Sequence, residues 1–203
     1  MGTVSAPQRL AVVDDAARIQ ALMRTSAREL FPRFYDARQA ASAVVHIAQL
    51  DMWLIEDGTY FVHEANGELV ACGGWSRRAK LYADGGDEPG DERLLDPAVE
   101  PARVRGMFVR GDWTRRGLGR AILESCERAA CAEGFQSLVL MATLPGEPLY
   151  RAFGFEEVSR SMVAMPDGVE TAAIEMRRPI RQTFGTGTLA ERSSAVLFSP
   201  RSP

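Results

Sequence analysis

The sequence from Val104 to Glu133, VRGMFVRGDWTRRGLGRAILESCERAACAE, decides the fold of this chain. It begins as an apolar strand that ends at Met107, Phe108 and Val109, passes through a polar turn that carries glycines, and enters a helix. Such a turn directs several backbone N–H groups and the positive end of the helix dipole at one point. This arrangement is typical of a phosphate-binding site.

The spacing of the glycines excludes two common phosphate-binding loops. The chain has no GxxxxGK[ST] sequence, which excludes a nucleoside-triphosphate loop of that kind. Gly111, Gly117 and Gly119 do not form GxGxxG, and no acidic residue is placed to bind a ribose. What remains is the sequence RRGLGRA, from Arg115 to Ala121, directly after the strand.

This turn resembles motif A of the GNAT superfamily, the acetyl-CoA-dependent N-acetyltransferases, whose pattern is (Q/R)xxGx(G/A). Gly117 and Gly119 occupy the small-residue positions of the pattern. Thr114 departs from it at the first position, where the adjacent Arg115 and Arg116 can supply positive charge. The resemblance implies that acetyl-CoA is the cosubstrate and that no metal is needed.

A second stretch of the chain resembles motif B of the same superfamily. The order Tyr-x-x-x-Gly-Phe is formed by Tyr150, Gly154 and Phe155, and it follows motif A at the separation expected for the family. Tyr150 matches the family's usual general acid, which protonates the departing sulfur; its phenol, with an ordinary pKa of about 10, is protonated at neutral pH. The alternative is an aromatic residue that packs on the sheet and whose hydroxyl is satisfied locally.

The resemblance also implies where coenzyme A binds. The strand before the turn separates from its neighbour at a bulge in the family, and its free backbone groups bind the pantetheine and point at the thioester oxygen. The pyrophosphate is expected on the N–H groups of the turn. The residues that match these positions are Met107, Phe108, Val109, Arg115, Arg116, Gly117, Leu118, Gly119, Arg120 and Ala121.

The general base and the acceptor pocket are less well defined. Many relatives carry a glutamate in the strand before the turn, but residues 102–105 read Ala-Arg-Val-Arg. Deprotonation of the amine would then pass through water, a backbone carbonyl, or a loop carboxylate such as Asp96 or Glu100. The loop from Phe31 to Tyr35 and the side chain of Trp75 are candidates for the acceptor wall. Two aromatics that flank a proline in a loop usually pack, and packing explains Trp75 equally well.

Composition limits the class of protein further. The chain has 203 residues, 25% of them charged and 46% hydrophobic, and a net charge of −3, so it gives no electrostatic case for nucleic acid or a membrane surface as partner. Cys72, Cys126 and Cys131 form neither a metal-ligand spacing nor a closed disulfide set. His46 and His63 lie far apart in sequence, which disfavours a His-based triad or a zinc site. No signal peptide or membrane-spanning run is visible, and we expect a cytoplasmic protein.

The order of elements predicts one domain over residues 1–180 and a loosely attached tail over 181–203. We expect the order β-α-α-β-β-β-α-β-α-β-β in an α/β (α+β) fold similar to that of GNAT proteins, a mixed, mostly antiparallel sheet of six to seven strands with helices on both faces. The expected strands are 10–13, 59–62, 69–75, 104–109, 137–142, 162–165 and 171–176. The expected helices are 14–30, 37–50, a third that ends near 133, and a short one that ends at 154.

Three local features carry specific predictions. Asn66-Gly67 predicts a tight hairpin turn with positive φ at both residues. Gly73-Gly74 within a strand predicts a bulge or a close backbone approach. The acidic residues of 83–92 form either a solvated surface or a lid over an amine-binding pocket.

The preferred function is an N-acetyltransferase that moves an acetyl group from acetyl-CoA to a primary amine of a small molecule or peptide by direct attack in a ternary complex. The alternative is a non-catalytic acyl-CoA-binding sensor or regulatory module, which the absent strand carboxylate favours. A nucleotide-dependent dehydrogenase is a third and weaker reading. The acidic loop hints at a cationic acceptor such as a polyamine or an aminoglycoside, and the oligomeric state, including a homodimer, stays open.

Overall fold

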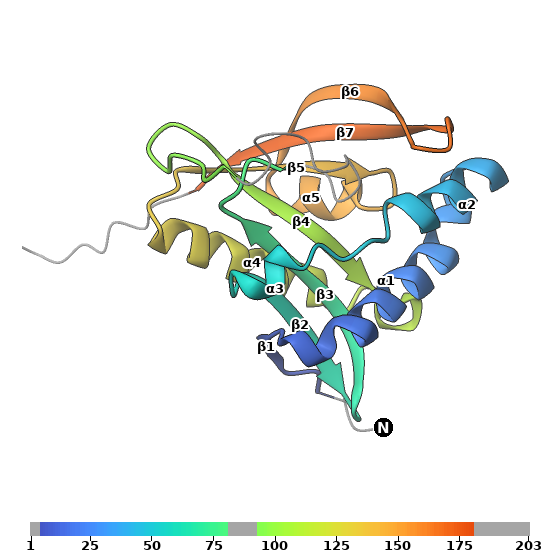
Figure 1. The fold of residues 1–203 in the computed structure, drawn as a ribbon, viewed down its shortest axis with the longest axis horizontal. Coiled ribbons are helices and arrows are strands. Elements are labelled where there is room, and N and C mark those ends of the chain that lie inside the picture. Colours follow the sequence, from blue (N-terminus) through green and yellow to red (C-terminus); the bar gives the residue numbers. More distant parts are fainter. Residues whose placement is uncertain (1–4, 81–92, 181–203) are drawn as a thin grey trace, which may run out of the picture.

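A computed structural model of the chain describes residues 5–80 and 93–180. Its centre is a seven-stranded sheet in the order β1-β2-β3-β4-β5-β7-β6, in which only the β4–β5 pair is parallel (Figure 1). The strands are β1 (Gln8–Leu10), β2 (Tyr60–Ala65), β3 (Glu68–Ser76), β4 (Ala102–Val109), β5 (Ser137–Thr143), β6 (Glu156–Ala164) and β7 (Glu170–Pro179). The mixed, mostly antiparallel sheet confirms the predicted fold class.

Helices cover both faces of this sheet (Figure 1). The helices on one face are α1 (Ala16–Leu30), α2 (Ala37–His46) and α3 (Trp53–Glu56), and those on the other are α4 (Leu118–Ala132) and α5 (Glu147–Phe153). Short 3-10 turns occupy Val13–Asp15, Phe31–Arg33 and Gly111–Trp113. The predicted order of elements is confirmed, with α3 added.

Each face of the sheet has its own apolar core. On one face, Ile19 and Met23 of α1 are fully buried against the sheet, as the helical spacing predicts. On the other face, Ile122, Leu123 and Cys126 of α4 are fully buried. The two cores hold α1 and α4 on opposite sides of β4, so that both helices reach the same central strand.

Three boundaries differ from the sequence predictions, each for a physical reason. The first strand lies at Gln8–Leu10 rather than 10–13, because Val12 and Val13 are exposed despite being apolar. The second helix ends at His46, since the N–H groups of residues 47 and 48 both turn back to one carbonyl. Strand β6 begins at 156 rather than 162; it is an edge strand, almost wholly exposed, and so lacks apolar alternation.

The predictions for the hairpin and the paired glycines are confirmed. Asn66 and Gly67 have φ of 52° and 79°, as a tight turn of this kind requires. At Gly74 an added Cβ would lie 2.5 Å from the carbonyl oxygen of Thr59, so only glycine fits between the neighbouring strands. The pairing of β3 with β4 shifts between Cys72 and Gly74, which is the expected bulge.

The predictions for the acidic loop 83–92 and the tail 181–203 concern residues outside the described part of the chain. The domain boundary near 180 therefore stays a prediction. No helix within residues 5–80 and 93–180 combines the length and the apolar character needed to cross a membrane.

Candidate active site

The central cleft forms where β4 leaves its parallel neighbour β5. The two strands pair only at Ala102 with Leu138 and at Arg103 with Val139, and no further pairs follow along β4. Backbone groups in the rest of that edge of β4 therefore have no strand partner on β5. The described structure thus has the open wedge that the resemblance predicts.

A bulge lies on the opposite edge of the same strand. Arg105 pairs with Gly74 and Phe108 pairs with Cys72, so two residues of β4 face one residue of β3. Gly106, inside the bulge, has a φ of +63°, a value that glycine adopts without strain. A bulge bends its strand, and bulges are common beside active sites. This bulge lies next to the open wedge between β4 and β5.

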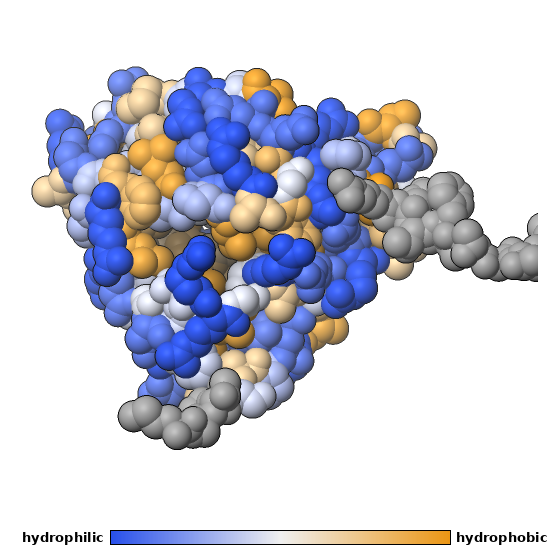
Figure 2. All heavy atoms as spheres, turned by 180° about the vertical axis from the view of Figure 1, so that it is seen from behind, coloured by the Kyte–Doolittle hydropathy of each residue, from blue (hydrophilic) through white to orange (hydrophobic). Residues whose placement is uncertain are grey.

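The wedge opens into a cavity of about 770 Å³. Its wall is formed by β4, the end of β5, the beginning of α5, the turn before α4, the segment between α2 and α3, and the β6–β7 hairpin. Figure 2, the view from behind Figure 1, shows a hollow bordered by hydrophobic residues and by hydrophilic side chains. A cavity of this size can hold a small ligand.

One end of the cavity meets the N-terminus of α4. Gly117 is the N-cap residue, with a φ of +83° and no capping hydrogen bond from its own side chain, because it has none. The first hydrogen bond of the helix runs from the N–H of Ala121 to the carbonyl of Gly117 at 2.9 Å. The N–H groups of residues 118–120 precede it and are available to an anion, as at other helix N-termini.

The structure brings most of the predicted cofactor-binding residues to this cavity. Arg116 is different, because its guanidinium lies 4.4 Å from the ring centroid of Trp113 and donates to the carbonyl of Asp112. Leu118 packs its side chain on the apolar core, and neither it nor Ala121 lines the cavity. Those that line the cavity are Met107, Phe108, Val109, Arg115, Gly117, Gly119 and Arg120.

Tyr150, the predicted general acid, lies in the cavity wall on α5. It is 8% exposed, and its ring packs edge-on against Phe155 with centroids 5.9 Å apart. Burial, and to a smaller degree the nearby Cys126 thiol, raise the pKa of the Tyr150 phenol above its ordinary value. Among the described residues the hydroxyl has no hydrogen-bond partner, so its proton is free for a ligand.

A buried ion pair in the cavity wall was not predicted from the sequence. Arg105 of the bulge bonds Asp51 at 2.7 Å, and their side chains are only 5% and 10% exposed. His46 also lines the cavity, and its Nε2 lies 3.6 Å from Oδ2 of Asp167. The available signal was Arg105 itself, since an arginine inside a buried strand requires a carboxylate partner.

The carboxylates considered as general bases lie elsewhere. Glu100 forms two hydrogen bonds of 2.7 Å with Arg93 and accepts another from the N–H of Asp96. These bonds, chiefly the one from Arg93, lower the pKa of Glu100 to about 2, which makes it a poor proton acceptor. Neither Asp96 nor Glu100 lines the cavity.

The two candidates for the acceptor wall have different positions. Phe31 lines the cavity, and Tyr35 of the same loop donates to the carbonyl of Ala172 in β7. The loop therefore borders the cavity through Phe31. Trp75 is 1% exposed and packs against Phe135 in the core on the α4 side, so its role is packing.

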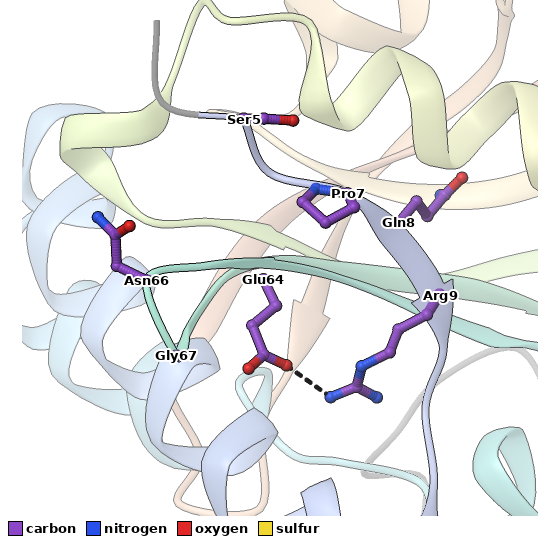
Figure 3. A pocket seen from close by; sticks show the side chains of 7 residues that line it. All are labelled: Ser5, Pro7, Gln8, Arg9, Glu64, Asn66 and Gly67. Atoms are coloured by element: carbon purple, nitrogen blue, oxygen red, sulfur yellow. Dashed lines mark hydrogen bonds and ion pairs between the residues drawn. The ribbon is translucent and has the colours of Figure 1, made fainter. Parts of the chain in front are cut away.

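A second, smaller hollow lies at the N-terminal edge of the sheet. It measures about 370 Å³ and is bordered by β1 and the β2–β3 turn (Figure 3). Its charged side chains, Arg9 and Glu64, bond each other at 2.8 Å. These two residues are thus already paired within the protein.

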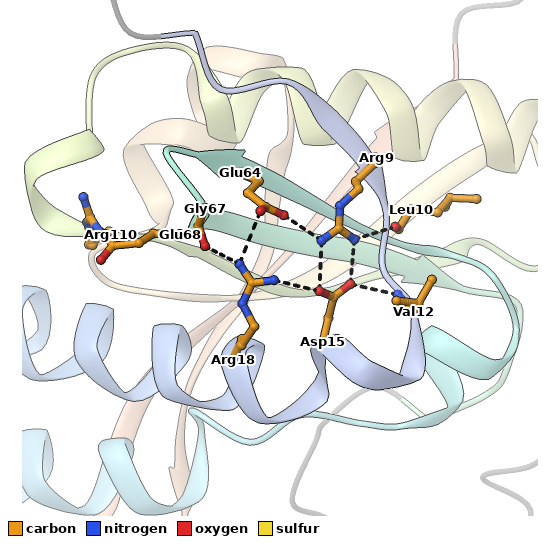
Figure 4. Close-up of polar contacts among 9 residues, drawn as sticks. All are labelled: Arg9, Leu10, Val12, Asp15, Arg18, Glu64, Gly67, Glu68 and Arg110. Atoms are coloured by element: carbon orange, nitrogen blue, oxygen red, sulfur yellow. Dashed lines mark hydrogen bonds and ion pairs between the residues drawn. The ribbon is translucent and has the colours of Figure 1, made fainter.

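The same pair belongs to a network that holds β1, α1 and the hairpin together (Figure 4). Arg9 bonds Asp15 at 2.6 Å, and Arg18 reaches both Asp15 and the carbonyl of Gly67. Asp15 is 3% exposed and also accepts from the N–H of Val12. The network is a structural clamp.

Among residues 5–80 and 93–180, no group of three His, Cys, Asp or Glu side chains is arranged to hold a metal ion.

Comparison with known proteins agrees with this geometry. The sequence profile of the acetyltransferase (GNAT) domain matches residues 56–157, about half of the chain. The chain therefore belongs to the GNAT family, and it is an acetyl-CoA-dependent acyltransferase. A search among curated proteins finds no match.

Solved structures share the fold at low sequence identity. A GCN5-related N-acetyltransferase from Rhodopseudomonas palustris is 16% identical, with 88% of this chain and 98% of that chain covered and a TM-score of 0.63. The PaiA N-acetyltransferase from Thermoplasma acidophilum, in complex with coenzyme A, is 12% identical over 86% and 99% of the two chains, with a TM-score of 0.58. YncA from Salmonella typhimurium, with acetyl-CoA, is 15% identical over 87% and 95%, with a TM-score of 0.56.

Proposed function

We propose that this protein transfers the acetyl group of acetyl-CoA to a primary amine of a small molecule or peptide, by direct attack in a ternary complex. The observation that carries the proposal is the single cavity in the β4–β5 wedge. It is lined both by the N-terminus of α4 and by the α2–α3 segment, so donor and acceptor have room to meet. Bringing the two reactants together in one site supplies much of the acceleration.

The donor end suits coenzyme A. The N–H groups at the start of α4 would bind the pyrophosphate, with Arg115 and Arg120 in the adjacent wall. The unpaired edge of β4, from Met107 to Val109, would bind the pantetheine. Coenzyme A in PaiA and acetyl-CoA in YncA, two proteins of the same fold, support this assignment.

The chemistry requires four events at the thioester. The amine nitrogen forms a bond with the carbonyl carbon, the carbon–sulfur bond breaks, the amine loses a proton, and the thiolate gains one. Backbone N–H groups of the β4 bulge would stabilise the oxyanion, a contact that is worth about 3–4 kcal/mol of barrier in comparable sites. Tyr150, kept protonated by burial, would give its proton to the leaving sulfur, and water would carry the proton of the amine back to the Tyr150 oxygen.

Three further assignments belong to the same proposal. Residues 1–180 form the catalytic domain, of which the family profile covers the central part. The reduced state of Cys72, Cys126 and Cys131, all free in the structure, fits a protein of the cytoplasm. Acetyl-CoA alone, with no metal, supplies the group transferred.

The test measures binding and turnover separately. Acetyl-CoA is incubated with the protein and a panel of amines while free thiol is followed, and coenzyme A binding is measured by calorimetry. Heat on coenzyme A addition together with amine-dependent thiol release is the expected result. Heat without thiol release would support the non-catalytic acyl-CoA sensor, which the lack of a carboxylate in residues 102–105 favours. No heat at all would refute both.

A further inference from the structure

We propose that the acceptor is a primary amine on an apolar body, and that the carboxylate of Asp51 binds its nitrogen. This inference rests on the proposed acetyl transfer and adds the substrate class and the residue that recognises it. It is drawn from three features of the cavity wall: apolar side chains, a buried ion pair, and one buried hydroxyl that has no partner among the described residues.

Much of the described cavity wall outside β4 is apolar. These side chains come from the end of α1 and the turn after it, from the segment between α2 and α3, from α3, and from the β6–β7 hairpin. Apolar walls favour an apolar ligand by removing its surface from water. The apolar side chains are Leu30, Phe31, Ile47, Leu54, Val163 and Met165.

Asp51 is the only carboxylate that lines the cavity among residues 5–80 and 93–180. Its Oδ2 accepts from Arg105 at 2.7 Å, and its Oδ1 accepts from the N–H of Trp53 at 3.1 Å. Each carboxylate oxygen can accept a second hydrogen bond, so the paired group can still bind an amine. A buried ion pair is a weak source of stability, because desolvation offsets the attraction. Its presence in the wall of a substrate cavity therefore points to recognition.

Thr171 provides an independent sign of a polar contact with a ligand. It is 1% exposed and lines the cavity from β7. Its Oγ1 has no hydrogen-bond partner within the described part of the chain. A buried hydroxyl left unpaired is costly, and such groups usually find a partner. An N–H of an acceptor amine can donate to this oxygen.

The charges of the described cavity wall make polycations poor acceptors. Asp51 is the one carboxylate of that wall, and Arg105, 2.7 Å away, already offsets part of its charge. A polyamine or an aminoglycoside would bring several ammonium groups, and each one beyond the first would be buried without a counter-charge. A monoamine with an aromatic or alkyl body has no such cost.

The experiment compares amines and variants in the full-length protein. Phenethylamine and hexylamine are tested against spermidine and kanamycin by thiol release, and phenethylamine is titrated into the protein–coenzyme A complex by calorimetry. We expect kcat/KM to be at least about tenfold higher for the two apolar amines than for the polycations. Asp51→Asn should weaken phenethylamine binding, and raise its KM, about thirtyfold, without changing coenzyme A affinity.

Asp57→Asn is the matched control. Asp57 is also paired with an arginine, Arg78, at 2.7 Å, its side chain is 15% exposed, and it does not line the cavity. This variant should bind phenethylamine like the wild type. If Asp51→Asn fails to fold because the buried charge of Arg105 has lost the Asp51 carboxylate, the double variant Asp51→Asn/Arg105→Gln removes both charges and should show the same loss.

The outcomes separate this inference from the proposed function. Normal coenzyme A binding with faster turnover of spermidine or kanamycin than of the apolar amines overturns the inference and leaves acetyl transfer standing. Wild-type phenethylamine binding in Asp51→Asn also overturns it. Absence of coenzyme A binding by the wild type would instead refute the proposed function.

Discussion

The hydroxyl of Tyr60 donates a hydrogen bond of 2.6 Å to the carbonyl oxygen of Gly106 and so connects β2 with the bulge in β4. Tyr60 is fully buried, and its ring crosses β3 at Gly74, where an added Cβ would lie 2.7 Å from the ring carbon Cδ2. The peptide bond after Gly106 is trans, so the N–H of Met107 points away from the carbonyl and from Tyr60. Tyr60 therefore fixes the orientation of a peptide group in the cavity wall.

Tyr60→Phe removes the hydroxyl, and with it this hydrogen bond and the contact with the Cys72 thiol, while the ring stays. We expect the free energy of unfolding to fall by about 1–2 kcal/mol, because the carbonyl of Gly106 is left without its partner. Since Tyr60 orients the bulge, kcat should also fall about tenfold while coenzyme A affinity stays unchanged. Urea denaturation, thiol-release kinetics and calorimetry measure the three quantities.

Thr59→Val is the control for that loss of stability. The Thr59 hydroxyl donates to the carbonyl of Leu54 at 3.2 Å, is buried, and lies outside the cavity wall. Its removal should cost a similar amount of stability, about 1 kcal/mol, and leave kcat at the wild-type value. If both variants lower kcat equally, Tyr60 has only a structural role.

Gly74→Ala should destabilise the protein by about 2–3 kcal/mol, because the new methyl group would meet the Thr59 backbone and the Tyr60 ring. Neither neighbour can move without shifting a strand. Gly111→Ala is the comparison, since the nearest atoms to its Cβ belong to the flexible Glu29 side chain, with the carboxylate oxygen closest at 2.5 Å. Gly111→Ala should lower the free energy of unfolding by less than about 1 kcal/mol. Equal thermal shifts for the two variants would contradict this account.

The sequence predicted those parts of the fold in which local and tertiary preferences agree. The apolar spacing of Ile122, Leu123 and Cys126 predicted the buried face of α4, and Asn66-Gly67 predicted the hairpin. The sequence-based prediction was wrong where tertiary contacts determine the limits of a strand. Strand β6 is held by pairing with β7, and its exposed side chains have no alternation to detect. Val12 and Val13, which follow β1, have the residue type of a strand, but the described pairing of β1 with β2 ends at Leu10.

The same distinction applies to the candidate site. The turn before α4 carries a local pattern, and the residues from Met107 to Val109 and from Arg115 to Arg120 could be proposed from sequence. The pairing of Asp51 with Arg105 spans 54 positions and depends on how the segment before α3 lies against β4. Likewise, nothing local distinguishes Arg116, which turns to Trp113, from Arg115, which lines the cavity.

Tyr150→Phe should lower kcat by about 100-fold or more, which is typical of a lost general acid, and leave coenzyme A binding unchanged. Equal losses in turnover and affinity would indicate a packing role instead. The pH profile gives a second check. Tyr150 must be protonated to act as the acid, and burial raises its pKa. The fall of kcat at alkaline pH should therefore lie above the ordinary tyrosine pKa of about 10.

Acid denaturation should reveal the clamp at the N-terminal edge. The hydrogen bond from Arg9, with smaller contributions from Val12 and Arg18, lowers the pKa of Asp15 to about 2. The ionised carboxylate therefore stabilises the fold above the unfolded pKa of about 3.9, and this stabilisation is lost as pH falls towards 2. Asp15→Asn should lower the free energy of unfolding at pH 7 by about 1–2 kcal/mol, a value that already allows for solvent screening of the exposed Arg9. The variant should also lose less stability than the wild type between about pH 4 and 2. Arg9→Gln should produce a similar profile, and an unchanged acid transition in both variants would contradict the assignment.

Arg115 and Arg116 are neighbours in sequence with different surroundings, and they provide a matched pair for the phosphate site. Arg115 lines the cavity, whereas the guanidinium of Arg116 stacks on Trp113 and donates to the carbonyl of Asp112. Arg115→Ala should weaken coenzyme A binding about tenfold at low salt, and the difference should shrink as salt is raised, because screening weakens charge–phosphate attraction. Arg116→Ala should keep wild-type affinity and lose only about 0.5–1 kcal/mol of stability from the stacked pair. Calorimetry at two salt concentrations distinguishes the variants. The opposite ranking would mean that the positive charge at the pyrophosphate comes from Arg116.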